Sequence, residues 1–221
     1  ATIDLHVHTA LSPCAAPEMA PPAILLAAER RGVRVLGVVD HAAAGNAGAM
    51  LEAAPAFAVR VLVGVEVESI EGVHVVTLFD TAEQAQAFAG LVQAHQPQLR
   101  NRPEFFGEQW LLDEWGNLLG LEERLLAIGC ALTVERLAEA AAAAGGLVFP
   151  AHIDRPGNGL LSILGLIPRR LKVPLFELSR FVTATEACAR WPELATRPLI
   201  TSSDAHYLPD IGSGCTLIPE A

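Results

Sequence analysis

The stretch that decides the fold is Asp4-Leu5-His6-Val7-His8-Thr9, in which two histidines alternate with apolar residues. In a β-strand, residues two apart point to the same face and lie about 6.5–7 Å apart along the chain. His6 and His8 can therefore bind one metal ion together, and alternating imidazoles are a favourable chelate for Zn, Mn or Fe. We predict a strand over residues 2–8 that ends in a metal site.

Four further fragments carry the same kind of signal. Each places a metal ligand at or next to the end of a segment rich in Val, Leu or Ile. The fragments are Val39-Asp40-His41, Val65-Glu66 with Val73-His74, Pro150-Ala151-His152 and Ser203-Asp204-Ala205-His206. Asp40 is expected to orient a histidine N–H rather than to bind metal itself. The set as a whole indicates a polynuclear metalloenzyme.

Short β-branched runs alternate with Ala- and Leu-rich amphipathic segments, a pattern typical of βα units around a parallel sheet. The expected strands are residues 2–8, 33–39, 59–65, 73–79, 147–150, 174–178 and 199–202. The expected helices are residues 22–31, 47–54, 82–95, 133–144 and 184–189. Most candidate ligands follow the carboxyl ends of these strands, where the chemistry of βα barrels collects. His74 lies near a strand start, and a hairpin return would bring it beside Glu66.

The segment from about Gln96 to Cys130 interrupts the alternation. It is expected to form a β-hairpin inserted between barrel units. No internal repeat or low-complexity linker marks a second domain. Residues 1–221 are therefore predicted to form a single domain, with residues 96–130 as an excursion from it.

The composition of the chain limits which binding partners and which cellular compartment we expect. The formal net charge is −10 and the arginines are scattered, so nucleic acid is expected to be an unlikely partner. No apolar stretch is long enough to span a bilayer, and no basic leader with an apolar core precedes Asp4. The four cysteines show neither C-x-x-C spacing nor a dense disulfide framework. These features favour a reduced, cytoplasmic location and no membrane partner.

The ligand fragments, in this order, resemble the polymerase-and-histidinol-phosphatase (PHP) family of metal-dependent phosphoesterases. Stand-alone bacterial members share stretches similar to residues 106–109 (Phe-Gly-Glu-Gln), 151–156 (Ala-His-Ile-Asp-Arg-Pro) and 201–207 (Thr-Ser-Ser-Asp-Ala-His-Tyr). The resemblance covers nearly the whole chain. It implies an α/β fold, namely a distorted (β/α)7 barrel of the PHP type with the hairpin insertion.

The same resemblance implies an activity and two alternatives to it. The implied activity is hydrolysis of a small phosphorylated substrate by a metal-activated hydroxide at a dinuclear or trinuclear site. One alternative is a PHP-type nuclease acting on nucleic acid. The other is a metal-binding regulatory module without catalysis.

The resemblance also divides the candidate ligands among two to three divalent ions (Zn, Mn or Fe). The first ion takes His6, His8, Asp204 and one oxygen of Glu66. The second takes the other Glu66 oxygen with His74 and His152. The third takes His41, His206 and either Cys14 or Glu18. Metal identity stays open, because mixed imidazole and carboxylate sites accept several first-row ions.

The chain departs from the family pattern after His8. Many members continue with a Ser-Asp-Gly that supplies an acidic ligand, whereas this chain has Ser12-Pro13-Cys14. Cys14 stands where some relatives place a histidine, and a thiolate is a sound zinc ligand. Glu18 offers a carboxylate a few residues on. The alternatives are a small apolar Cys14 and a solvated Glu18.

Two arginines follow strands toward the same face as the candidate ligands. Arg155 and Arg180 could bind a phosphate through bidentate hydrogen bonds. The predicted catalytic residues are Glu66, Asp204, Arg155 and Arg180. Arg102, in the excursion, and His95, at the end of a helical stretch, are interpreted as surface residues.

Overall fold

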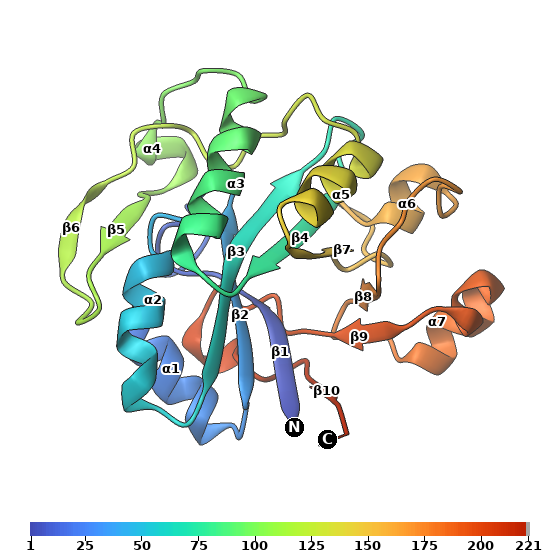
Figure 1. Ribbon diagram of the computed structural model, residues 1–221, viewed down its shortest axis with the longest axis horizontal. Helices are drawn as coiled ribbons and strands as arrows, with labels where there is room; N and C mark the ends of the chain where they lie inside the picture. The colour runs from blue at the N-terminus through green and yellow to red at the C-terminus, as the bar shows by residue number, and fades with distance from the viewer. Residues whose placement is uncertain (220–221) are drawn as a thin grey trace.

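A computed structural model describes residues 1–219 and shows a curled sheet with helices packed around it (Figure 1). The sheet has six strands in the order β10-β1-β2-β3-β4-β7. The three parallel strands are β1 (Thr2–Val7), β2 (Val35–His41) and β3 (Arg60–Glu68). The strands joined by antiparallel pairing are β4 (His74–Phe79), β7 (Leu147–Pro150) and β10 (Thr216–Leu217).

A second, two-stranded sheet continues the curvature of the first sheet and leads back toward β1. It pairs β8 (Phe176–Leu178) with β9 (Leu199–Thr201) in parallel. β8 packs beside β7, and the segment after β9 returns to β1 through a parallel bridge between Val7 and Ala205. The predicted α/β class of the PHP type is confirmed. The exact (β/α)7 count is not, because a hairpin rather than a helix joins β3 to β4 and the ladder breaks between β7 and β8.

The predicted helices are present within one or two residues of their expected bounds. They are α1 (Pro21–Arg30), α2 (Ala47–Ala53), α3 (Ala82–Ala94), α5 (Val134–Ala143) and α7 (Ala184–Arg190). Thr81, Thr133 and Thr183 cap α3, α5 and α7, each accepting a backbone N–H with its side-chain oxygen. Short elements escaped prediction, because one turn carries little periodicity. They are α4 (Pro103–Phe106), α6 (Leu160–Leu164) and the 3-10 turns η1 (Ala54–Ala56), η2 (Pro192–Thr196) and η3 (Leu208–Asp210).

The two largest apolar cores among the described residues lie on the two faces of the curled sheet. The larger core packs the buried faces of the helices, such as Leu25 of α1 and Phe88 of α3, against the strands. The smaller core fills the inside of the curl and includes Leu5, Val76 and Phe149. The strands are therefore buried on both faces, which explains their continuous runs of Val, Leu and Ile.

The excursion forms the expected hairpin, from β5 (Trp110–Leu112) to β6 (Leu118–Leu121). Its base is attached to the loop that follows β1, because the Trp110 N–H donates to the Ala10 carbonyl at 2.8 Å. Gly107 has φ +96°, and a Cβ there would lie 2.2 Å from the Pro13 carbonyl oxygen. Only glycine fits so close an approach. That residues 1–221 form a single domain stays a prediction.

No helix among residues 1–219 combines the length and the apolar character that a bilayer crossing needs.

Candidate metal centre

Six imidazoles and two carboxylates converge where the parallel strands end, at one mouth of the curled sheet. They form three overlapping groups, in each of which the ligand atoms lie within 4.8 Å of one another. The groups are His6, His8, Glu66 and Asp204; Glu66, His74 and His152; and His8, His41 and His206. Glu66 belongs to two groups, as a bridging carboxylate must.

Strand register explains how β2, β3 and β4 bring their ligands together. Parallel pairing of β2 and β3 sets His41 opposite Glu66. Antiparallel pairing of β3 and β4 sets Glu66 opposite Val76, so His74 occupies a diagonal position on the same face. The His74 Nδ1 atom lies 2.7 Å from Glu66 Oε1. The expected hairpin return therefore does place His74 beside Glu66.

The spacing of the donor atoms fits a shared ion. His6 Nε2 lies 3.2 Å from His8 Nε2 and 3.3 Å from Glu66 Oε1. Two ligand atoms about 2.0–2.1 Å from one tetrahedral ion are roughly 3.4 Å apart. In addition, the buried Nδ1 atom of His152 has no hydrogen-bond partner among the described residues. Both observations suit a site built for divalent ions, and the ligand roles themselves stay predictions.

The backbone is unusual at three points of the cluster. His152 has φ 30°, Asp204 has φ 51°, and Ala42, next to His41, has φ 49°. Left-handed conformations cost free energy for residues other than glycine, and they concentrate at functional sites. The turns that follow β2, β7 and β9 thus adopt strained conformations at the residues that present candidate ligands.

A buried hydrogen-bond chain fixes the ring of His8. Ser12 Oγ lies 2.9 Å from His8 Nδ1 and donates to Asp40 Oδ1 at 2.7 Å. Asp40 also accepts from the Thr9 N–H at 2.9 Å. Asp40 therefore orients a histidine through Ser12, close to its expected role. Such partners set which ring nitrogen is available to a metal.

Glu177, on β8, is the functional residue that the sequence reasoning missed. Its Oε2 atom lies 3.0 Å from His6 Nδ1 and accepts the His152 N–H at 2.9 Å. The side chain is buried, and a buried carboxylate needs such partners. The available signal was a single charged residue between Phe176 and Leu178 in a short apolar strand.

Burial and charge divide the histidines into two kinds. Burial disfavours a charge on both His6 and His74, but nearby carboxylates outweigh it. Glu66 raises the pKa of His74 to about 9. Glu177 and Glu66 together raise the pKa of His6 well above its usual value. Burial lowers the pKa of His41 to about 3 and that of His206 to about 4. A metal ion would compete with a proton for these imidazoles, because ligating imidazoles are neutral.

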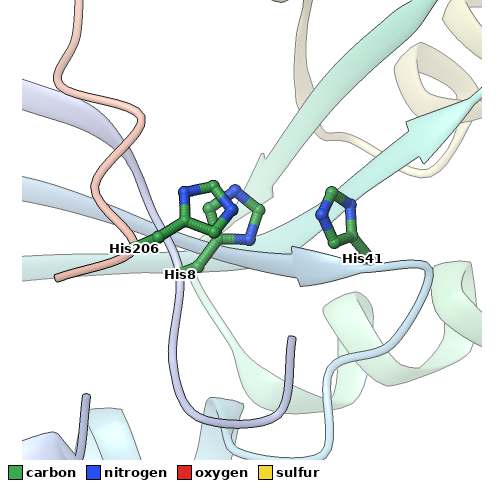
Figure 2. A group of neighbouring side chains, drawn as sticks. All are labelled: His8, His41 and His206. Carbon is green, nitrogen blue, oxygen red and sulfur yellow. The ribbon is translucent and has the colours of Figure 1, made fainter. Parts of the chain in front are cut away.

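The third group lies at the rim of the cluster. Figure 2 shows the rings of His8 and His206 against each other, with His41 alongside at the end of β2. The centroids of the His8 and His206 rings are 4.1 Å apart. Cys14 Sγ lies 3.3 Å from His41 Nε2. Cys14 is not a member of the third group itself, and its role as a further donor to a third ion stays a prediction.

The structure places Glu18, the alternative ligand, at the surface, and its role stays a prediction. The residue is exposed and belongs to none of the groups found among the described residues. The turn from Ala16 to Met19 explains this, because the Met19 N–H donates to the Ala16 carbonyl and the Met19 side chain is fully buried. The adjacent Glu18 therefore faces solvent.

Replacing Cys14 with Ser should remove part of the bound metal. Burial, followed by the charge of Glu66, raises the pKa of the Cys14 thiol to about 12, so the thiol ionises only when a cation lies beside it. We expect Cys14→Ser to lower the metal content by about one equivalent, measured by elemental analysis. Glu18→Gln is the matched control and should leave the content unchanged. Equal metal in wild type and Cys14→Ser would remove Cys14 from the ligand set.

A cavity of about 370 Å³ opens on one side of the cluster. Candidate ligands and both arginines line it: Cys14, His152, Asp204, His206, Arg155 and Arg180. The structure therefore brings Arg155 and Arg180 to the site, and each already has a carboxylate partner. Arg155 pairs with Asp204, and Arg180 lies 3.0 Å from Asp210.

A second cavity, of about 230 Å³, reaches the other side of the cluster through His41, Glu66 and His74. Glu68 lines this second cavity, whereas neither Arg155 nor Arg180 does. The two candidate phosphate-binding arginines therefore lie at the first cavity, together with the carboxylates of Glu177, Asp204 and Asp210.

The two residues interpreted as surface residues lie outside the cluster. Arg102 is exposed and pairs with Glu104 at 3.3 Å. His95 is exposed, and its ring Nδ1 lies 2.9 Å from the Leu91 carbonyl within its own helix. Both positions agree with the sequence interpretation.

The family model of the PHP domain matches residues 4–145, well over half of the chain. The chain belongs to the PHP domain family. No curated protein matches the sequence significantly. Family membership places this PHP chain among the metal-dependent hydrolases, so the alternative of a module without catalysis is not retained.

Solved structures share the fold of this PHP chain at low identity. Endonuclease Q from Pyrococcus furiosus, a lesion-specific endonuclease, has 21% identity and a TM-score of 0.70 over 94% of this chain. The chain spans only 49% of that endonuclease. A candidate metal-dependent phosphoesterase from Bifidobacterium adolescentis has 15% identity and a TM-score of 0.64, with 92% of this chain and 87% of that one covered.

The expectation that nucleic acid is an unlikely partner is wrong. A further structure of endonuclease Q, with a TM-score of 0.69 and 21% identity over 94% of this chain and 49% of that one, holds a 27-mer duplex with an abasic lesion at its active site. A protein of this fold therefore binds DNA at that site. Net charge misled us because it averages over the whole surface, whereas a scissile phosphate meets the local charge of the site.

Proposed function

We propose that this PHP chain hydrolyses phosphate esters with two or three divalent ions held by the clustered residues. The observation that carries the proposal is the shared Glu66: one buried carboxylate within reach of two groups of imidazoles, beside a cavity with two arginines. When bound, divalent ions supply a Lewis acid and a nucleophilic water at neutral pH. Metal identity, ion count and the cytoplasmic location stay predictions.

The residues of the chain have separate tasks in this proposal. Glu66 and Asp204 supply negative charge that holds the ions. Glu177 and the pair Ser12 and Asp40 keep the imidazoles of His6 and His8 in fixed orientations. Arg155 lines the cavity beside Asp204 and would bind a phosphate oxygen that the ions do not contact.

A small phosphate ester is the substrate that we favour. The cavity of about 370 Å³ falls in the lower part of the range of small-molecule sites. A phosphodiester within a nucleic acid is the second candidate, and the likeness of the fold to endonuclease Q supports it. Both substrates place one phosphate at the cluster, so only their turnover separates them.

Arg155→Ala should raise KM for a small phosphate monoester by about 10- to 100-fold, because a hydrogen bond to a charged group contributes about 1.5–3 kcal/mol. Arg102→Ala, which removes an exposed arginine of the excursion, is the matched control. The assay compares p-nitrophenyl phosphate, bis(p-nitrophenyl) phosphate and an abasic duplex, with Zn, Mn or Fe added in turn.

The outcomes of this assay distinguish the two candidate substrates, a small phosphate ester and a nucleic acid. Cleavage of the duplex without turnover of either small ester would replace our favoured substrate with the nucleic acid. If protein shown to carry metal releases no product from any of the three, the proposed hydrolysis is refuted.

A further inference from the structure

Two exposed aromatic side chains stand at the cavity that opens on the metal cluster. Phe181 is 76% exposed and Tyr207 is 53% exposed, and both line this cavity. Single exposed apolar residues are common and need no explanation. Here two of them, from segments 26 residues apart in the sequence, border one cavity whose other lining residues include arginines and candidate ligands.

The two aromatics come from adjacent places in the fold. Phe181 follows β8 and Tyr207 follows β9, and these two strands are paired in parallel with Leu178 opposite Thr201. The carboxyl ends of parallel neighbours lie side by side, so both loops leave the sheet at the same mouth. The aromatic pair thus faces the same space as Asp204 and His206.

Buried hydrogen bonds hold the loop that carries Phe181. Asp154, a buried carboxylate, accepts from the Ser179 N–H and from the Ser179 hydroxyl, both at 2.6 Å. Ser179 Oγ in turn accepts the Phe181 N–H at 3.4 Å. The guanidinium carbon of Arg180 lies 5.1 Å from the centre of the Phe181 ring. One wall of the cavity therefore presents a cation and an apolar ring together.

The segment of Tyr207 is fixed as well. The backbone carbonyl of the preceding residue, His206, accepts a hydrogen bond from the Ala16 N–H at 2.9 Å. The carbonyl of Tyr207 accepts one from the Asp210 N–H at 3.0 Å. Walls that are held in place before binding lose little conformational entropy when a ligand arrives. Exposed rings on such walls are suited to stacking against a planar group.

We propose that Phe181 and Tyr207 are specificity-determining residues that select phosphate esters carrying a planar ring. The phosphate lies at the metal cluster and Arg155, and the ring of the alcohol portion lies against the aromatic pair. A nucleotide and an aryl phosphate share this chemistry. The inference rests on the phosphoesterase function proposed above and adds the class of substrate.

The test measures binding, so it does not depend on turnover. Calorimetry with metal-loaded protein compares phenylphosphonate with methylphosphonate, which offer the same anionic group with and without a ring. Wild type should bind phenylphosphonate about tenfold more tightly, since each aromatic contact contributes about two- to tenfold. The double variant Phe181→Ala/Tyr207→Ala should lose this preference, and Tyr207→Phe should keep it. Trp115→Ala, at an exposed aromatic of the hairpin, is the matched control.

Adenosine monophosphate and a short single-stranded oligonucleotide distinguish the two sources of a planar ring, a free molecule and a chain end. Equal binding of both phosphonates, or a preference that survives in the double variant, overturns the inference while leaving phosphoester hydrolysis intact. Absence of binding by either phosphonate overturns it as well. Failure of hydrolysis with the ring preference intact would count against the proposed function alone.

Discussion

Replacing Glu66 with Gln should lower kcat for phosphate ester hydrolysis by on the order of 10³-fold, with the protein still folded. The substitution keeps the volume of the side chain and removes the negative charge that two groups of imidazoles share. The carboxylate is buried, and His74 with His6 keeps its pKa well below the usual value against the opposing effect of burial. Steady-state kinetics with a circular dichroism spectrum of each protein measures both expectations.

Two controls show whether this effect is specific. Glu52→Gln removes an exposed carboxylate of α2, and His95→Ala removes the exposed imidazole at the end of α3. Both variants should stay within about twofold of wild-type kcat, as substitutions at exposed positions usually do. Should Glu66→Gln retain activity like these controls, Glu66 is not the residue that joins the groups.

Protein purified without chelator should carry more than one equivalent of transition metal, and stripping it should abolish hydrolysis and lower the Tm. Binding at 100 times Kd stabilises a fold by about 2.7 kcal/mol. For a chain of this size each kcal/mol corresponds to about 2–4 °C. We therefore expect a Tm shift on the order of 5–10 °C for each tightly bound ion, measured by scanning calorimetry before and after chelation.

Readdition of metal is the control for chelator damage. Activity and Tm should both return when one of Zn, Mn or Fe is restored, because the ligands remain in place. A protein that holds no transition metal after chelator-free purification, and whose Tm is indifferent to chelator and to added ions, would contradict the metal-centre interpretation as a whole.

The sequence predicted the strands and most of the candidate ligands that converge in the structure, because both follow from local periodicity. His6 and His8 alternate in a strand, and apolar runs end at His41, Glu66 and His152. These signals depend on neighbours in the chain. They were sufficient to anticipate even the hairpin that returns His74 to Glu66.

What the sequence did not predict depends on tertiary contacts. Glu177 has no motif around it, and its role exists only because β8 lies beneath His6. Glu18 was one of two substitutes, with Cys14, for the acidic ligand that many family members place after His8, and its exposure follows from the burial of the neighbouring Met19. Phe181 and Tyr207 became meaningful only when the pairing of β8 with β9 placed them at one cavity.

The candidate site is assembled from the two ends of the fold, and this has a consequence for synthesis on the ribosome. Ser203 donates from its hydroxyl to the His6 carbonyl across 197 residues, and Asp4 accepts the Ser203 N–H. At about 5–20 residues per second, the first strand waits roughly 10–40 s for its last partners to emerge. Until then β1 exposes an unpaired edge and two imidazoles to the cell. Completion of the candidate metal centre is thus a late event in the synthesis of residues 1–206, because it requires that Ser203, Asp204 and His206 have been translated and folded against β1.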